Sequence, residues 1–184
     1  GQTGAEKGGL QAARILGIPT AGFCPAGYMT ENGQDLSLKE FSLTETFSDD
    51  YKERTIKNID ISDGTVIFAN ININGEITGG GSRLTFNMCN ELNKPVIVNP
   101  SKEEFIKWIK DKNIKKLNIA GNRESQNAGL QSYVKYFLVH SLMDYLKTTH
   151  DATSEYKDKF IKIMNHKDSF CDIYGKYKGI KTGD

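Results

Sequence analysis

The stretch SDGTVIFANININGEITGGGSRLTFNMCNELNKPVIV, residues 62–98, decides the fold of this chain. After a Ser-Asp-Gly turn signal, residues 65–69 form an apolar run that is typical of a buried strand. A glycine turn at residues 78–82 precedes a predicted helix over residues 83–92, and residues 95–98 form a second apolar run. The order strand, glycine turn, helix, strand predicts two parallel strands joined by a crossover helix.

The same alternation continues on both sides of this stretch. On the N-terminal side, apolar residues within 10–16 predict a helix that a glycine closes, and a short strand follows. On the C-terminal side, Ser101 and Glu104 form a capping-box signature ahead of a helix. Residues 116–120 form another strand, and residues 130–146 carry an apolar stripe at helical spacing. We therefore predict an α/β fold, a Rossmann-like doubly wound parallel sheet with helices on both faces.

Composition limits the class of protein. The chain has 184 residues, which suits one ligand-binding domain over residues 1–147, with residues 148–184 as a helical extension and loose tail. Its 24 basic and 23 acidic residues nearly cancel, so we expect no nucleic-acid partner and no membrane partner. The three cysteines and three histidines lack the spacing of a zinc site, so we expect free thiols, no structural metal and a cytoplasmic location.

Three glycine-containing or polar segments form the candidate binding site. In open parallel sheets, ligands bind beyond the carboxyl ends of the strands, where backbone N–H groups at helix N-termini hold anions. We expect the three segments to converge there on a phosphate-bearing or oxyanion-bearing small molecule. The first segment has Gln2, Thr3 and Gly4, and the second has Thr78, Gly79, Gly80, Gly81 and Ser82. The third runs from Asn122 to Ser125, with Arg123, Glu124 and Ser125 as its candidate binding residues.

Each of these features also has a plainer interpretation. Glycine triplets occur in loops that are merely flexible, and Arg123 with Glu124 could form only a surface ion pair. Their position between a strand and a helix favours the ligand site. Arg54 and Asn58 lie four residues apart on a predicted helix over residues 50–60, where a solvated face is the commoner outcome.

The long polar segment over residues 24–47 is a candidate binding loop. It is rich in Gly, Thr, Ser, Asn and Pro with weak periodicity, and loops of this length in compact domains are usually functional or mobile. Cys24 precedes a proline and has no histidine nearby in the sequence. We interpret it as a small buried thiol rather than a nucleophile.

Six segments of the chain, in this order, resemble the molybdenum carrier protein family. They are GQTGAEKGGL from residue 1, GFCPAGYMTENG from residue 22, FSLTET from residue 41, DYKERTIKNIDISDGT from residue 50, TGGGSRLT from residue 78 and LNIAGNRES from residue 117. The resemblance covers about residues 1–142 and implies a Rossmann-like fold related to cytokinin-activating phosphoribohydrolases and nucleotide-sensing domains. It also implies a strand before Gly1, so we expect the first strand to be truncated. The family is associated with binding of molybdenum cofactor or a related anion and with homo-oligomers, so we expect both here.

The chain departs from the family pattern at several positions. Ala26 and Tyr28 stand where the family tends to have Lys and Arg, which removes two positive charges. Glu6 and Lys7 replace the usual Asp and Arg, and Asn122 stands where proline is common. The identity of the ligand therefore stays open, and Tyr28 favours an aromatic group such as a pterin or a nucleobase.

Three functions are consistent with this pattern. A carrier binds molybdenum cofactor or a related pterin or nucleotide without turnover. A nucleoside monophosphate phosphoribohydrolase needs a carboxylate soon after the glycine turn. Residues 84–87 offer none and the next acid is Glu91, which leaves Glu124 as the candidate. A sensor or scavenger of a nucleotide-derived signal would use the same loops. We favour the carrier, because it needs no catalytic base.

Overall fold

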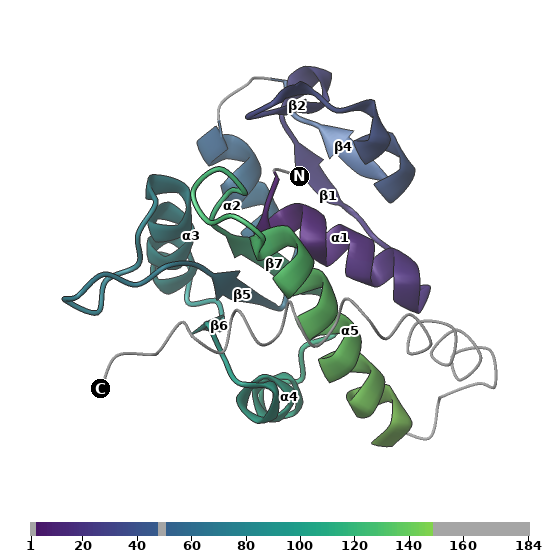
Figure 1. The fold of residues 1–184 in the computed structure, drawn as a ribbon, viewed down its shortest axis with the longest axis vertical. Coiled ribbons are helices and arrows are strands. Elements are labelled where there is room, and N and C mark those ends of the chain that lie inside the picture. The colour runs from purple at the N-terminus through teal and green to yellow at the C-terminus, as the bar shows by residue number, and fades with distance from the viewer. Residues whose placement is uncertain (1–2, 48–50, 149–184) are drawn as a thin grey trace.

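The computed structural model describes residues 3–47 and 51–148 (Figure 1). Strands and helices alternate along most of this part of the chain. Gln2 and the residues from 149 onward lie outside the described residues, so the predicted domain division at residue 147 stays a prediction. Within the described ranges, no helix has both the length and the apolar character that crossing a membrane requires.

The elements of the described part follow the predicted order. The helices are α1 (Ala5–Leu16), α2 (Tyr51–Asp60), α3 (Gly80–Glu91), α4 (Lys102–Asp111) and α5 (Leu130–Thr148), with short 3-10 helices at Ala26–Tyr28 and Leu36–Phe41. The strands are β1 (Gly22–Cys24), β2 (Met29–Thr30), β3 (Gly33–Gln34), β4 (Leu43–Glu45), β5 (Gly64–Phe68), β6 (Val96–Val98) and β7 (Leu117–Gly121). Local signals set several ends. α1 stops at Gly17, which has a left-handed φ of 66°, and α4 starts with the predicted capping box of Ser101 and Glu104.

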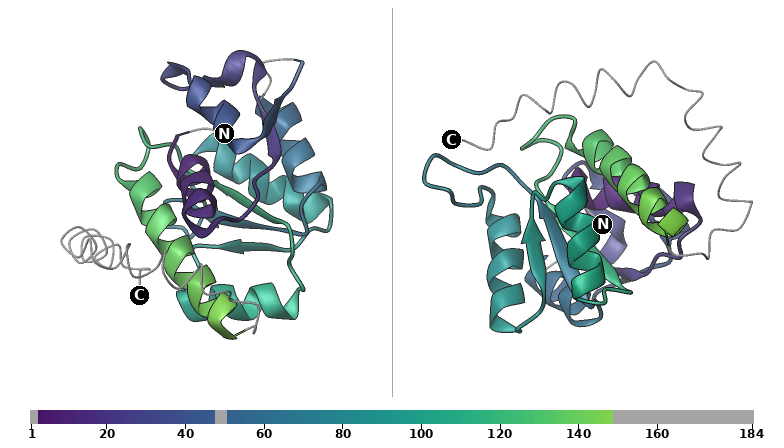
Figure 2. Two further views of the ribbon diagram at one scale, coloured as in Figure 1. Left: turned by 90° about the vertical axis from the view of Figure 1, so that its right-hand side faces the viewer. Right: turned by 90° about the horizontal axis from the view of Figure 1, so that it is seen from below.

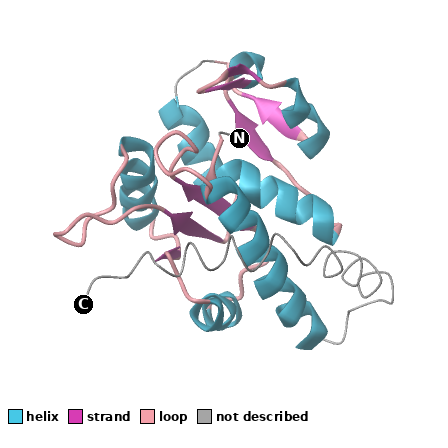
Figure 3. Cartoon of the chain, viewed as in Figure 1, coloured by secondary structure: helices cyan, strands magenta, loops and turns pink. Residues whose placement is uncertain are grey.

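The parallel strands lie in two groups (Figure 3). In the first group, β5 pairs in parallel with β6 on one edge and with β7 on the other. In the second group, β1 pairs in parallel with β4, while the short β2 and β3 form a separate antiparallel pair. Every residue of β5 is buried, as expected for a parallel strand that is covered on both faces.

Helices cover both faces of the first group of strands (Figure 2). On one face, Val66 and Phe68 of β5 pack with buried side chains of α1, α4 and α5. On the other face, Ile67 packs with Phe86 of α3, and α2 lies between α3 and β1. These contacts confirm the predicted α/β class with a Rossmann-like, doubly wound arrangement.

α3 begins earlier than the sequence predicted. The predicted start was near Arg83, whereas the helix starts at Gly80 and includes two glycines in its first turn. Glycine is unfavourable inside helices, which is why the pattern suggested a later start. The first intrahelical hydrogen bond runs from Arg83 N to Gly79 O at 3.1 Å, so the turn that it closes necessarily includes Gly80 and Gly81.

Residues 25–45 form a small lobe next to β1 (Figure 1). A buried cluster joins the lobe to β1, in which Leu38, Phe41 and Leu43 pack with Cys24. The side chain of Asp35 in the lobe forms an ion pair with Lys7 of α1. The predicted irregular loop is therefore an ordered unit, held by this cluster and by the contact to α1.

Candidate functional site

The three predicted segments meet at the carboxyl end of β7, where the side chain of Asn122 joins them. Asn122 is only 2 % exposed. Its Nδ2 donates to Thr78 O at 2.9 Å and to Ser82 Oγ at 3.3 Å, and its Oδ1 accepts from Asn70 N at 2.6 Å. Its main-chain carbonyl accepts from Ala5 N at 3.2 Å. Asn122, the first residue of the third predicted segment, is thus the centre of the junction.

The turn before α1 lies directly against the loop after β7. Gly4 has a φ of 69°, and a Cβ atom at this position would lie 2.3 Å from Asn122 O and 2.7 Å from Glu124 N. Only glycine fits so close an approach of two backbones. In addition, Glu124 N donates to Thr3 Oγ1 at 3.2 Å. The first and third segments therefore form one continuous surface.

The glycine turn opens α3 without a side-chain cap. Gly79 is the N-cap residue, with a φ of 87°, and a Cβ atom there would lie 2.5 Å from Asn122 Nδ2. Cβ atoms at Gly80 or Gly81 would meet nothing within 4 Å. α4, by contrast, begins with a complete capping box. The first turn of α3, with N–H groups that lack intrahelical partners, is thus open beside the junction.

Glu31 bonds to this surface through Thr3 and Ser125 and was not among the residues predicted from the sequence. Its carboxylate accepts hydrogen bonds from the hydroxyl groups of Thr3 and Ser125, and from Ser125 N at 3.4 Å. Burial by itself raises the pKa of Glu31, but the hydrogen bonds from Ser125 and Thr3 outweigh it, so the net pKa is lowered. The negatively charged carboxylate of Glu31 therefore occupies hydrogen-bond donors that could otherwise bind an anionic ligand. Its only signal in the sequence was its place in the long loop.

Arg123 and Arg54 both lie over the ring of Tyr51. Their Cζ atoms are 5.0 Å and 5.5 Å from the ring centroid, respectively. Arg54 is 7 % exposed, and its Nη1 donates to both carboxylate oxygens of Glu6 at 3.1 and 2.9 Å, while its Nε has no hydrogen-bond partner. Arg54 therefore forms a buried ion pair with Glu6, and Arg123 is the more accessible positive charge at the junction.

The side chain of Glu124 caps α5. Its carboxylate accepts hydrogen bonds from Gly129 N and from Gln131 N, the latter at 2.9 Å. Both oxygens thereby satisfy amides at the start of the helix. Glu124 contributes its main-chain N–H to the loop surface, while its carboxylate, the candidate base of a hydrolase, has a structural role here.

Tyr28 lies in the small lobe, with a φ of 53°. Its ring packs against the buried cluster of the lobe, and Lys39 Nζ lies 5.3 Å from the ring centroid. The ring therefore has protein partners in this conformation. The predicted stacking of Tyr28 on a ligand stays a prediction.

Arg54 and Asn58 face the protein, which corrects the expected solvated face. Arg54 pairs with Glu6, and the side-chain amide of Asn58 bonds to the main chain of Phe23. The reason is that α2 packs against β1, so the helix face that carries both residues is covered.

Among the described residues, no three side chains of His, Cys, Asp or Glu gather in a way that could hold a metal ion. Cys24 and Cys89 are buried free thiols, and burial raises the pKa of each. A raised pKa disfavours the thiolate that nucleophilic attack needs.

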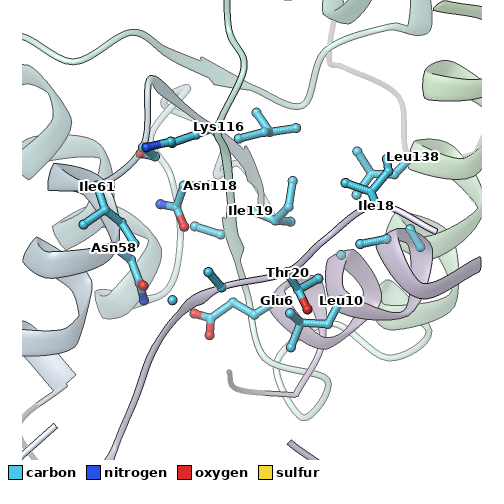
Figure 4. Close-up of a pocket in the computed structure, with 18 of the residues that line it drawn as sticks. Glu6, Leu10, Ile18, Thr20, Asn58, Ile61, Lys116, Asn118, Ile119 and Leu138 are labelled. Atoms are coloured by element: carbon cyan, nitrogen blue, oxygen red, sulfur yellow. The ribbon is translucent and has the colours of Figure 1, made fainter. Parts of the chain in front are cut away.

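A separate cavity of about 500 Å³ lies between β7 and β1 (Figure 4). Most of its walls come from α1, α2, α5 and the two strands, while Thr85 of α3 and Ile109 of α4 also line it. None of the predicted binding residues lines it. The loop junction is therefore a surface site at the carboxyl end of β7, distinct from this cavity.

The fold and the loop junction define a Rossmann-like α/β domain in which α1 and α3 both begin at glycines, with the first turn of α3 open. Residues 1–142 match the model of the circularly permutated YpsA SLOG family, and the chain belongs to this family. None of the curated proteins matches the chain.

A solved structure supports the same relationship. The crystal structure of a protein from Syntrophus aciditrophicus SB, named “putative molybdenum carrier protein”, is 30% identical to this chain. The match covers 79% of this chain and 90% of that chain, with a TM-score of 0.65. Together, the family match and this structure confirm the resemblance that the six sequence segments indicated.

Proposed function

We propose that this protein binds a small anionic molecule at the junction of its three loops and acts as a carrier. The proposed ligand is molybdenum cofactor or a related pterin or nucleotide, because the similar structure is named as a molybdenum carrier. The observation that carries the proposal is the open first turn of α3 at Gly80 and Gly81, beside the Asn122 junction that fixes the other two loops.

The chemistry of the junction suits phosphate and oxyanion groups. Its donors are main-chain N–H groups, the hydroxyl groups of Thr3 and Ser125, and the guanidinium of Arg123. Hydrogen bonds from such donors to a charged acceptor are among the stronger ones in proteins. The proposed binding residues are those predicted from the sequence, Gln2, Thr3, Gly4, Tyr28, Thr78, Gly79, Gly80, Gly81, Ser82, Arg123, Glu124 and Ser125, with Glu124 acting through its backbone.

Glu31 acts in this proposal as an internal carboxylate that the ligand displaces. It and an incoming phosphate would compete for the Thr3 and Ser125 donors. Glu31→Gln removes the negative charge and keeps the size, so we expect anionic ligands to bind severalfold more tightly, as measured by isothermal titration calorimetry. Weaker binding in this variant would instead make Glu31 a ligand-holding residue.

The carrier is favoured over a phosphoribohydrolase because Glu124 has both carboxylate oxygens on amides of α5. A general base needs a free oxygen within reach of the reacting group. The sensor remains the second candidate, since its ligand would use the same donors. Association into homo-oligomers is part of the proposal, and light scattering of the purified protein tests it.

Ligand extraction tests the proposed function. The purified full chain is analysed by native mass spectrometry and then by thermal shift with molybdate, molybdopterin, AMP and ADP-ribose. We expect a shift with molybdopterin and no turnover. A shift with nucleotides alone would favour the sensor, and release of free base from AMP would favour the hydrolase.

A matched pair of variants locates the site. Gly80→Val places side-chain atoms where nothing lies within 4 Å, so it should weaken ligand binding at least about tenfold while the fold is kept. Asn87→Ala, at an exposed position further along α3, is the control and should bind normally. Unchanged affinity in Gly80→Val would remove the glycine turn from the site.

A further inference from the structure

The ring of Tyr51, at the start of α2, differs from the aromatic rings of the core in what lies against it. The rings of β5, α4 and α5 pack on one another. Tyr51 is 37% exposed, and the guanidinium groups of Arg54 and Arg123 lie over its ring, with Cζ atoms 5.5 and 5.0 Å from the centroid. The electron-rich face of an aromatic ring attracts such cations. A partly exposed aromatic ring therefore lies beside the loop that carries Arg123.

Arg54 links this ring to the first turn of α1. Tyr51 and Arg54 are three residues apart in α2, so they are neighbours on one side of the helix. Arg54 Nη1 donates to both carboxylate oxygens of Glu6 at 3.1 and 2.9 Å, and the Arg54 side chain is only 8% exposed. Glu6 comes two residues after Gly4, whose backbone lies against that of Asn122. A buried ion pair thus fixes the ring next to the loop junction.

Arg123 reaches the same ring from the loop junction itself. It directly follows Asn122, and its side chain is half-buried. Its guanidinium lies over the Tyr51 ring and attracts the charge of Glu31. An anionic ligand that displaces Glu31 offers Arg123 a charge-assisted hydrogen bond, which is stronger than the attraction of a cation to an exposed ring. Binding of the anion therefore draws Arg123 away from the ring and uncovers one part of it.

Tyr28, which the sequence analysis expected to meet a flat ligand, is placed differently. Its ring packs against the buried cluster of the lobe, and Lys39 Nζ lies 5.3 Å from the centroid. Stacking on a ligand would take the Tyr28 ring out of that cluster. The Tyr51 ring has only to exchange Arg123 for the ligand, so its cost of rearrangement is smaller.

We propose that Tyr51 is the residue on which the planar ring of the ligand stacks, and that it makes the site select phosphates that carry such a ring. This inference rests on the proposed function, because the anionic group of the same ligand occupies the loop junction. Arg123 turns from the Tyr51 ring to the anion, and the ligand ring takes its place. Stacking on an aromatic side chain tolerates different bases. The chemistry recognised is therefore a planar, nitrogen-containing aromatic ring, as in a pterin or a nucleobase.

The exchange favours the bound state because a weak contact is replaced by two stronger ones. A base stacked on an aromatic side chain contributes more than a guanidinium over an exposed ring does. The released Arg123 adds its hydrogen bond to the anion. A phosphate without a ring gains only the second of these contacts. We therefore expect a ring-bearing phosphate to bind at least about tenfold more tightly than a sugar phosphate.

Matched ligands and isothermal titration calorimetry with the full chain test this inference. AMP and neopterin monophosphate carry both a ring and a phosphate, whereas ribose 5-phosphate carries the phosphate alone. In the wild type, at least one of the first two should bind about tenfold or more tightly than ribose 5-phosphate. Preference for AMP identifies a nucleobase site, and preference for neopterin monophosphate identifies a pterin site.

Two variants of Tyr51 separate the ring from its hydroxyl group. Tyr51→Leu removes the ring, so the preference should fall to about twofold or less while the affinity for ribose 5-phosphate stays within about threefold of the wild type. Tyr51→Phe keeps the ring and should keep the preference. Circular dichroism verifies that both variants are folded.

Tyr145→Leu is the matched control. Tyr145 also has a cation near its ring, since Lys110 Nζ lies 5.8 Å from the centroid. It belongs to the C-terminal end of α5, roughly 20 Å along the helix from the loop after β7. This variant should keep the wild-type preference for a ring-bearing phosphate.

Nuclear magnetic resonance supplies a readout that does not depend on the leucine variant. In protein with labelled tyrosine rings, the Tyr51 signal is the one missing from Tyr51→Phe. It should show nuclear Overhauser contacts with the ring protons of the bound probe. If none of the three probes binds the wild type, the proposed function itself fails and this inference with it. If the probes bind but show no preference for a ring, or if Tyr51→Leu keeps the preference, this inference alone is overturned.

Discussion

Asn122 is the single side chain on which the loop junction depends most. It is 2 % exposed and bonds to Asn70 N, Thr78 O and Ser82 Oγ. Asn122→Ala leaves these groups without their partner, so we expect the free energy of unfolding to fall by about 2–3 kcal/mol, measured by urea denaturation. The loss should accompany weaker ligand binding, because the glycine turn loses its anchor.

Gln126→Ala is the matched control for this prediction. Gln126 belongs to the same loop but is exposed, and its Oε1 lies 3.5 Å from Arg123 N, the outer limit of a hydrogen bond. Its replacement should change the free energy of unfolding by no more than about 0.5 kcal/mol. If both variants lose the same stability, the junction is held by the loop as a whole and not by Asn122.

The carboxylate of Glu31 makes the small lobe sensitive to pH. Its pKa is lowered in the folded protein, on balance, by hydrogen bonds from Ser125 and Thr3 that outweigh its burial. The stability that the ionised form contributes is therefore present above the ordinary pKa of a glutamate and is lost as the pH falls through the lowered value. We expect the difference in urea midpoint between wild type and Glu31→Gln to be largest at pH 7 and to narrow toward pH 3. A difference that is constant with pH would show that these hydrogen bonds do not depend on the charge.

Individual residues of the binding site could be predicted only where a local sequence pattern indicates them. Gly4 and Gly80 stand out because a glycine before a helix is a local signal, and their loops do meet in the structure. Asn122 and Glu31 have partners that are distant in the chain, such as Asn70 and Ser125. No local pattern encodes such pairs, because a lone Asn or Glu in a loop is equally consistent with solvent exposure.

Among the helices, α3 shows how two adjacent glycines differ. Gly79 has a φ of 87° and a Cβ atom there would lie 2.5 Å from Asn122 Nδ2, so Gly79→Ala should destabilise the fold by about 1–3 kcal/mol. Gly80 lies within the helix with open space around it, so Gly80→Ala should be neutral or stabilise by up to about 1 kcal/mol. Urea denaturation compares the two. Equal effects would mean that the glycine turn can shift away from Asn122.

The regular elements were predictable where the periodicity was long. The strands β5, β6 and β7 and the helix α5 have apolar runs or stripes that fix their type. The lobe over residues 25–45 was read as an irregular loop because β2 and β3 have two residues each, too few to show a period of two. The sequence also could not show that β1 and β4 form a pair separate from the first group of strands, because strand pairing depends on contacts between distant parts of the chain.

At the scale of the whole molecule, we expect the lobe to unfold locally before the sheet does. β5 lies between two strands and under helices on both faces, whereas the lobe rests on the small cluster of Cys24, Leu38, Phe41 and Leu43. Regions with few buried contacts exchange their amide hydrogens through openings of lower free energy. We expect the Leu38 amide to exchange well before the Val66 amide in native-state hydrogen exchange. Similar opening free energies for the two would show that the lobe and the sheet unfold together.

The ion pair between Lys7 and Asp35 should control the opening of the lobe. Both side chains are 23% exposed, and the hydrogen bond from Lys7 is the largest cause of the lowered pKa of Asp35. Lys7→Ala removes a partly shielded contact between α1 and the lobe, so it should lower the opening free energy of Leu38 by about 0.5–1 kcal/mol. The Val66 amide should keep its protection, because β5 does not contact this ion pair.

Lys107→Ala breaks an exposed pair with Asp111 inside α4 and should leave the lobe unchanged. Loss of protection at Val66 in the Lys7 variant would contradict a local role, since the pair would then stabilise the entire fold.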